Sequence, residues 1–211
     1  MTTTTLPAKT GFREALREQR WDDHRFYHHS RVNQSLHLFS ACCFLTSYAL
    51  LAFDGAAAVW IGWFGAWISR QVGHFFFEPK GYDAVNEMTH REKEDVKIGY
   101  NLARKVMLFA VFLSAPAVLY LDPDLFGLIR PYTEVGSYLG DLSMLWLAVG
   151  GGALLLRTVW LFFVRDVQTG IVWFTKILTD PFNDVRTYWK SPYHLLRGEL
   201  IDPELGRRAR A

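Results

Sequence analysis

The sequence has few cysteines. Its 211 residues include only Cys42 and Cys43, which are adjacent within an apolar run. This arrangement excludes a disulfide framework or a zinc ribbon, because both need cysteines spread along the chain. A charge excess is also lacking, since 23 Lys and Arg stand against 21 Asp and Glu, a net charge of +2. Nucleic-acid-binding domains carry a basic excess, so we expect no nucleic-acid partner.

Long apolar runs dominate the rest of the sequence. Four blocks cover residues 36–53, 57–77, 106–121 and 143–164. A helix needs about 20 residues to cross a bilayer core of roughly 30 Å, and the two shorter blocks can span with local thinning. Four buried helices of a soluble bundle are the alternative, but such helices carry a polar stripe. The sequence therefore predicts an all-α, polytopic membrane helical bundle with about four transmembrane helices.

The basic residues predict how this bundle is oriented. Lys and Arg are frequent before the first block, between the second and third blocks (residues 78–105) and after the fourth, whereas the other two links hold only Arg130. The positive-inside rule places both termini and residues 78–105 in the cytoplasm. We therefore expect a cytoplasmic segment over residues 1–35, a bundle over 36–164 and a cytoplasmic segment over 165–211.

The two cytoplasmic segments carry further signals. The first apolar block follows a charged segment, so no cleavable signal peptide is expected. Residues 168–199 are amphipathic, with possible breaks at Asp180-Pro181 and Ser191-Pro192, and predict short helices on the membrane surface. The tail has no retrieval signal for the endoplasmic reticulum, which favours a bacterial inner membrane.

Histidines gather on the cytoplasmic side of this topology. Imidazole is a common ligand for iron, copper and zinc, and carboxylates often complete an iron site. Three pairs lie four residues apart, on one face of a helix: Asn33 with His37, Arg70 with His74, and His74 with Glu78. The seven histidines are His24, His28, His29, His37, His74, His90 and His194.

A fourth pair of residues and the types of ligand available also bear on the predicted metal site. Glu87 and His90 form Glu-x-x-His, a spacing found in di-iron helical bundles. Imidazole and carboxylate are better supplied here than thiolate, which favours iron. Each feature also has a structural interpretation: interface histidines are often plain amphipathic residues, and Glu87 lies in a charged run typical of a solvated helix face. Arg70 and Arg157 can snorkel to the interface.

Two motifs resemble the yeast-type 2-hydroxy fatty acid dioxygenase family. Residues 27–37 contain Tyr-His, an asparagine five residues after that histidine, and a histidine four residues further on. Residues 67–78 contain Trp, then Gly-His, with Phe-Glu beginning three residues after the histidine. The resemblance covers roughly residues 20–80. The sequence departs from the family after Glu78, where Pro79-Lys80-Gly81 replaces a basic residue followed by Pro-Ala-Leu.

The resemblance implies a small multi-span membrane protein that uses Fe(II) and molecular oxygen to shorten 2-hydroxy fatty acids by one carbon. It implies roles for the matching residues in a site that binds iron and a fatty-acyl substrate within the lipid bilayer. We predict that iron is held by histidines, with His90 or Glu78 as a fourth ligand or an orienting group, and that Arg70 or Asn33 holds the substrate carboxylate. The predicted metal ligands are His28, His37, His74 and His90, and the predicted catalytic residues are Asn33, Arg70 and Glu78.

Three alternatives remain open at this point. A di-iron lipid hydroxylase or desaturase normally has more histidines in closely spaced boxes, and His28-His29 is the only close pair here. A haem protein without enzymatic activity would use His37 and His74 as axial ligands. A structural or lipid-scaffold protein would hold no metal.

Overall fold

The structure, a computed structural model, describes residues 11–78, 80–83, 86–98 and 102–202. Its described residues form helices and no named strand, so the all-α prediction is confirmed. The elements are α1 (Phe12–Tyr27), α2 (Arg31–Leu50), α3 (Gly55–Trp60), η1 (Ile61–Trp67), α4 (Ile68–Phe76), α5 (His90–Val96), α6 (Leu102–Leu121), α7 (Val135–Val164), α8 (Val167–Tyr188) and α9 (Ser191–Leu196).

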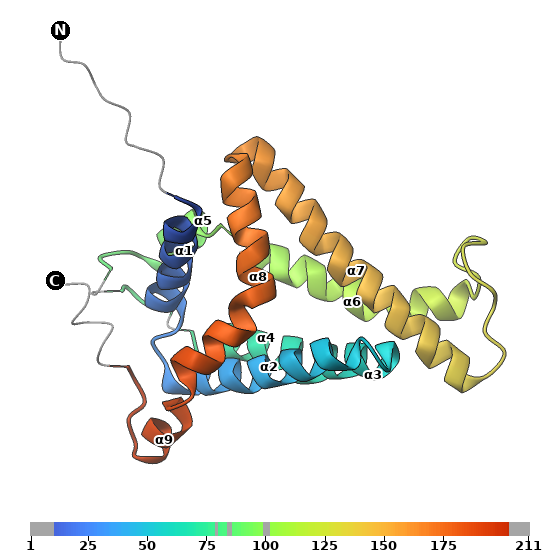
Figure 1. The fold of residues 1–211 in the computed structure, drawn as a ribbon, viewed down its shortest axis with the longest axis horizontal. Coiled ribbons are helices and arrows are strands. Elements are labelled where there is room, and N and C mark those ends of the chain that lie inside the picture. The colour runs from blue at the N-terminus through green and yellow to red at the C-terminus, as the bar shows by residue number, and fades with distance from the viewer. Residues whose placement is uncertain (1–10, 79, 84–85, 99–101, 203–211) are drawn as a thin grey trace, which may run out of the picture.

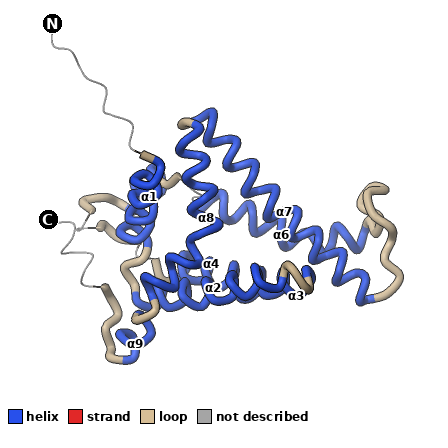
Figure 2. Tube along the Cα trace, viewed as in Figure 1, coloured by secondary structure: helices blue, strands red, loops and turns tan. Residues whose placement is uncertain are grey.

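Two helical hairpins and one long helix set the shape of the protein. Helix α2 pairs with the composite helix α3–η1–α4, and α6 pairs with α7 (Figure 1). Helix α8 leaves the end of α7 and runs back across α2, so that α7, α8 and α2 enclose a triangle in this view. The loop between α6 and α7 lies at the far end from α1 and α9 (Figure 2). Helix α8 therefore connects the second hairpin to the first.

Side-chain caps explain where three of these helices begin. Ser30 accepts a hydrogen bond from the Asn33 amide at the start of α2. Asp54 accepts from the Ala57 amide (2.9 Å) and starts α3 after a tight turn. Asp166 accepts from the Thr169 amide (2.9 Å) and starts α8 immediately after α7. Each cap satisfies an amide that would otherwise have no partner in the first helical turn.

The second apolar block is one continuous helical run with a π-helical centre. Residues 55–60 are α-helical, 61–67 are π-helical and 68–76 return to α-helix. Gly62 and Gly65 lie in the π segment, and a Cβ added at either would touch Ser47 or Cys43 of α2. The two glycines therefore allow close packing of the first hairpin.

An aromatic core joins the two hairpins. The rings of Trp63 and Phe112 stack with centroids 3.5 Å apart. Trp146 of α7 donates its indole N–H to the Phe112 carbonyl (3.0 Å) and contacts Trp63. Burial of aromatic side chains of this size contributes a large share of the packing energy. This core fixes α6 and α7 against η1.

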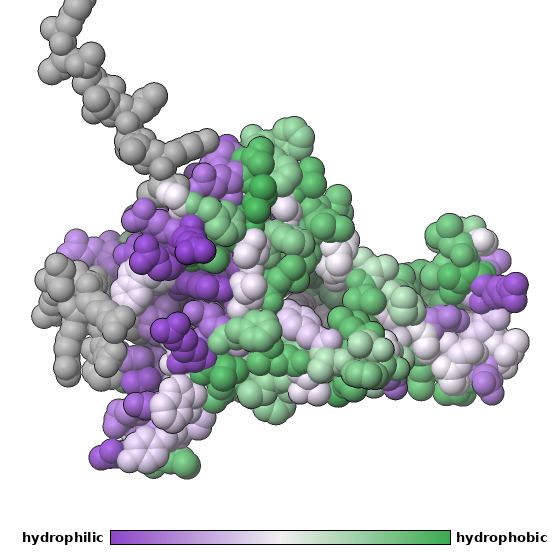
Figure 3. Space-filling view, viewed as in Figure 1, coloured by the Kyte–Doolittle hydropathy of each residue, from purple (hydrophilic) through white to green (hydrophobic). Residues whose placement is uncertain are grey.

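Two helices have the length and composition to cross a membrane. They are Ala103–Leu121 of α6 and Val135–Val164 of α7, and only 17% and 11% of their apolar windows are buried in the protein. In this view hydrophobic side chains cover much of the surface over α7 and α8, while hydrophilic side chains gather around α1 (Figure 3). Exposed apolar helices of this length are typical of lipid contact. Neither α2 nor the helical run 55–76 has the combination of length and apolar composition that α6 and α7 have.

Helix α8 differs from its sequence-based prediction. The expected break at Asp180-Pro181 is wrong, because α8 continues through Pro181 to Tyr188. Proline removes one backbone hydrogen bond from a helix interior, but the packing of α8 against α1, α2 and α7 holds the helix together. The break at Ser191-Pro192 is confirmed, since α9 begins there with Pro192 in its first turn.

Candidate metal centre

Three of the predicted histidines meet in one cluster. His28 lies in the turn between α1 and α2, His37 on α2 and His74 on α4. Their candidate ligand atoms all lie within 4.8 Å of one another. The Nε2 atoms of His28 and His37 are 3.2 Å apart, and the His74 ring centroid lies 4.9 Å from that of His37. Both His28 and His37 are buried.

The opposite ring nitrogens of these histidines face acceptors. His28 Nδ1 donates to the Asp23 carbonyl oxygen (2.8 Å), and His74 Nδ1 donates to Glu78 Oε2 (2.8 Å). His37 Nδ1 faces Asp184 Oδ2 at 3.7 Å, too far for a hydrogen bond, and makes no hydrogen bond to a described residue. Because a carbonyl oxygen can only accept, His28 carries its proton on Nδ1 and leaves a lone pair on Nε2. This pattern of outer acceptors is typical of histidines that bind a metal through the other nitrogen.

The electrostatic environment favours neutral ligands. Burial lowers the pKa of His28 well below 6.5, and the nearby His37 lowers it further. A metal requires the neutral imidazole, so no proton has to leave His28 at neutral pH. Three convergent imidazoles form a donor set that suits iron, copper or zinc. The described residues therefore fit a metal ion at this point.

Glu78 orients His74. Its Oε2 accepts from His74, while its Oε1 is buried without a hydrogen-bond partner among the described residues. Burial raises the pKa of Glu78, and Lys97 and Lys105 oppose this shift. The carboxylate therefore acts on the cluster through the His74 ring.

We expect Glu78→Ala to weaken metal binding about 10–100-fold, as loss of an outer acceptor commonly does. Glu78→Gln keeps an oxygen that can accept from His74, so its loss should be smaller. Competition titration against a chelator measures both affinities. Equal losses in the two variants would instead indicate that Glu78 is itself a ligand, because the amide is a much poorer one.

Asn33 connects two helices. It is fully buried, and its Nδ2 donates to the Tyr27 carbonyl (2.8 Å). Its Oδ1 lies so close to Gly73 that a Cβ there would overlap it. The side chain therefore fixes the crossing of α2 and α4 beside His37 and His74, rather than pointing at an open position.

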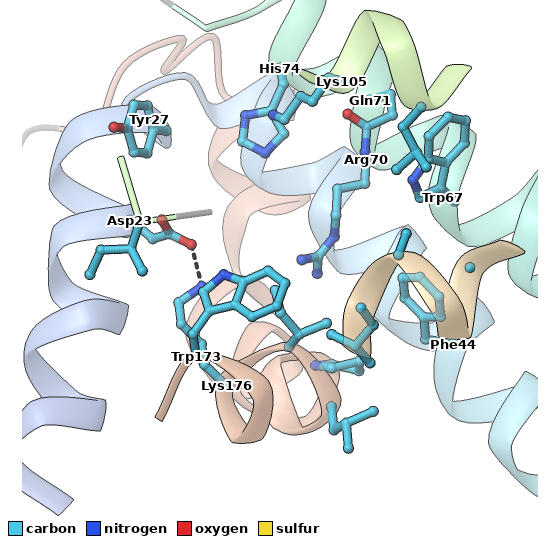
Figure 4. Close-up of a pocket in the computed structure, with 18 of the residues that line it drawn as sticks. Asp23, Tyr27, Phe44, Trp67, Arg70, Gln71, His74, Lys105, Trp173 and Lys176 are labelled. Atoms are coloured by element: carbon cyan, nitrogen blue, oxygen red, sulfur yellow. Dashed lines mark hydrogen bonds and ion pairs between the residues drawn. The ribbon is translucent and has the colours of Figure 1, made fainter. Parts of the chain in front are cut away.

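Arg70 is already paired in this structure. Its Nη2 donates to Asp184 Oδ2 in a short contact, and Asp184 also faces His37. The guanidinium points away from His74, toward Trp173 (Figure 4). Arg70 thus links α4 to α8 and holds the carboxylate that faces His37.

His90, Glu87 and His29 lie outside the cluster. The expectation that Glu87 and His90 share a helix face is wrong, because Glu87 has φ +52° and precedes the helix that His90 begins. Thr89 and Glu92 form a capping box that sets this start of α5. His29 donates from Nε2 to the Arg25 carbonyl and lies 3.6 Å from Asp83. The three clustered histidines found among the described residues do not include His90.

Helix α8 supplies functional residues that the sequence reasoning missed. Lys176, Asp180, Asp184 and Tyr188 are buried and spaced four residues apart, so they form one face of the helix. Lys176 pairs with Asp180 (2.7 Å) and, in a short contact, with Asp23 of α1. This spacing was visible in the sequence, but the expected break at Pro181 concealed it.

Tyr188 covers the cluster from this helix. Its ring centroid lies 5.7 Å from that of His28, and its hydroxyl lies 3.0 Å from His24 Nδ1. Burial raises the pKa of Tyr188, and Asp184 adds to the shift. The tyrosine therefore stays protonated and can act as a hydrogen-bond donor beside the histidines.

Gln34 fixes the backbone of His28. Its Nε2 donates to the His28 carbonyl (2.8 Å) and to Asp202 Oδ2 (2.9 Å). Its Oε1 accepts from Ser191 Oγ (2.6 Å) and Arg31 (2.9 Å). Gln34 is fully buried, so this network holds the turn that carries the first histidine.

A large cavity extends from His74 into the protein. Its volume is about 850 Å³, within the roughly 300–1,000 Å³ typical of ligand sites. His74, Arg70 and Lys105 lie together at one part of its wall (Figure 4). Aromatic and aliphatic side chains line much of the remainder, including Trp63, Phe112, Trp146, Leu147 and Leu154. The cavity therefore joins a polar region beside the cluster to an apolar region between the hairpins.

A second, polar cavity reaches the cluster from the other side. It measures about 450 Å³ and is lined by His28, His37 and Tyr188. Asp23, Arg70 and Lys176 line both cavities. The ion pairs that these three residues make therefore form part of the wall between an apolar and a polar space.

Comparison of the chain with protein-family models, curated proteins and solved structures finds no match.

Proposed function

We propose that this protein is a membrane non-haem iron dioxygenase that shortens 2-hydroxy fatty acids by one carbon. The observation that carries the proposal is the cluster of three imidazoles, two of them hydrogen-bonded to outer acceptors, of which His74 lines a large and mostly apolar cavity. A metal site beside a space suited to an acyl chain is the arrangement that such a reaction needs. The resemblance of residues 27–37 and 67–78 to the dioxygenase family supports the same activity.

The proposed topology has four spans with cytoplasmic termini. Helix α2 and the helical run 55–76 join α6 and α7 as spans, since each is 20 residues or longer and this reaches across about 30 Å. The polar residues at the start of α2 are covered by α8 and α9 rather than by lipid. The histidine cluster then lies at the cytoplasmic end of the bundle, in a bacterial inner membrane.

His28, His37 and His74 would hold Fe(II) through Nε2. The iron supplies the activation of molecular oxygen, which protein side chains do not perform. The chain's own residues orient two of the imidazoles, His28 through the Asp23 carbonyl and His74 through Glu78. Asp184 faces the third, His37. The apolar part of the large cavity would hold the acyl chain, and its aromatic walls would fix the chain's position.

Two alternatives fit the geometry less well. The His37 and His74 rings are in edge contact with centroids 4.9 Å apart, which leaves no space for a haem between them. A di-iron centre needs a second group of ligands, and the described residues supply one group of three. A mononuclear site agrees better with both observations.

The test is conversion of 2-hydroxypalmitic acid by the detergent-purified full chain loaded with Fe(II) under nitrogen and then exposed to oxygen. We expect a product one carbon shorter by mass spectrometry, formed only with both iron and oxygen. His74→Ala should abolish the product, whereas His194→Ala should not, because His194 of α9 bonds Glu199 and lies outside the cluster. Absence of the shortened product from the iron-loaded wild type would refute the proposal.

A further inference from the structure

One basic side chain at the wall of the large cavity makes no ion pair with another described residue. The basic side chains that line this cavity are Arg25, Arg70, Lys97, Lys105 and Lys176. Arg25 pairs with Asp22, Arg70 with Asp184, Lys97 with Glu94, and Lys176 with Asp23 and Asp180. Lys105 makes no ion pair within 4 Å among the residues that the structure describes.

The position of Lys105 places this charge beside the histidines. It lies in the first turns of α6, and its side chain is next to His74 in the cavity (Figure 4). It is half-buried, and Leu108 and Phe112 on the same helix line the cavity beyond it. A lysine that makes no ion pair with another described residue, at the boundary between a polar and an apolar space, is suited to a ligand that has a negative head and an apolar tail.

The paired cations are less available for this role. Arg70 would have to leave Asp184, which would leave a buried carboxylate without its partner. Lys97 is held by Glu94 at 3.0 Å and lies over the Tyr27 ring, 3.6 Å from its centroid. Lys105 can bind an anion without breaking an ion pair between described residues.

We propose that Lys105 binds the carboxylate of the fatty-acyl substrate and makes the cavity selective for acids over neutral lipids. The inference rests on the proposed function for the identity of the substrate. It assigns the substrate carboxylate to Lys105 in place of Arg70 or Asn33. The acyl tail then extends along α6 toward Trp63 and Trp146, while the carbon next to the carboxylate stays beside His74.

Metal-free protein tests this inference by binding alone. Trp63, Trp67, Trp146 and Trp173 line the cavity, so a bound brominated lipid should quench tryptophan fluorescence. The probes are dibromostearic acid and dibromostearyl alcohol, titrated into the detergent-purified full chain. We expect the acid to bind about tenfold or more tightly than the alcohol, as one charge-assisted hydrogen bond allows.

Variants locate the charge responsible. Lys105→Gln should bind the acid no better than the alcohol and should keep wild-type affinity for the alcohol, which shows that the cavity is intact. Lys105→Arg should restore part of the preference. Arg104→Gln, at the exposed neighbouring position outside the cavity, should match the wild type. The inference is overturned if Lys105→Gln keeps the preference, or if Arg70→Gln alone removes it.

Failure of the proposed function gives a different result. If Lys105→Gln removes the acid preference but iron-loaded wild type forms no shortened product, Lys105 still binds the anion and only the dioxygenase activity is wrong. If the wild type shortens 2-hydroxypalmitic acid and Lys105→Gln does so with an unchanged KM, the activity stands and this inference fails.

Discussion

The His37→Ala variant is expected to lose the iron that the proposed site would bind. His37 is buried at the centre of the cluster, with its Nε2 3.2 Å from His28 and its ring against His74. Its removal leaves two imidazoles on separate segments, and two such ligands bind a divalent metal far more weakly than three preorganised ones. Elemental analysis of purified protein, after anaerobic loading with Fe(II) and desalting, measures the change from about one iron per chain in the wild type.

A matched control separates this effect from a general loss of histidine. His194→Ala removes an imidazole of α9 that bonds Glu199, and it should leave the iron content unchanged. Circular dichroism of both metal-free variants shows whether the helices are intact. Retention of the full iron content by a folded His37→Ala protein would mean that the metal is bound elsewhere.

Gly73→Ala is expected to have the second large effect, on stability and iron together. A Cβ at this position would overlap Asn33 Oδ1 and would also touch the His37 ring (3.6 Å). Asn33 cannot easily move aside, because its Nδ2 is bonded to the Tyr27 carbonyl in a fully buried position. The crossing of α2 and α4 must widen, and overpacking of this kind costs about 1–3 kcal/mol.

The same widening separates His37 from His74, so iron content should fall with thermal stability. Differential scanning fluorimetry and elemental analysis measure the two changes. Gly140→Ala is the control, since nothing lies within 4 Å of a Cβ at that position in α7. An unchanged melting temperature for Gly73→Ala would show that the helices do not depend on this close approach.

Three of the four predicted metal ligands meet in the structure, because local spacing and topology acted together. His74 and Glu78 lie four residues apart at the end of α4, and the structure joins them by a hydrogen bond. The short turn at Asp54 makes an antiparallel hairpin, which returns α4 to the start of α2 and thus brings His74 to His37. Helical spacing fixes the first contact, and the tight turn at Asp54 fixes the second by making α2 and α4 antiparallel neighbours.

Other features depend on packing that no local pattern contains. The sequence predicted that residues 168–199 form short helices on the membrane surface. In the structure the polar face of α8 is buried, and Asp184 lies against Arg70 and His37. Only the return of α8 across the first hairpin buries this face. Glu87 and His90 have helical spacing, but the capping box at Thr89 starts α5 at His90 and leaves Glu87 outside the helix. Here the capping residue, and not the helical periodicity, determines where the helix begins.

The Gln34 network has a consequence for how the protein is made. All three clustered histidines lie in the first part of the chain, up to residue 74, but Gln34 is held by Ser191 and Asp202. The segment near residue 200 also pairs with the start of α2, through the Arg31 amide and the Leu200 carbonyl (2.9 Å). A ribosome adds about 5–20 residues per second, so the histidines wait on the order of ten seconds for these partners. The site for the proposed metal is therefore complete only when synthesis is almost finished, and we expect loading to follow translation.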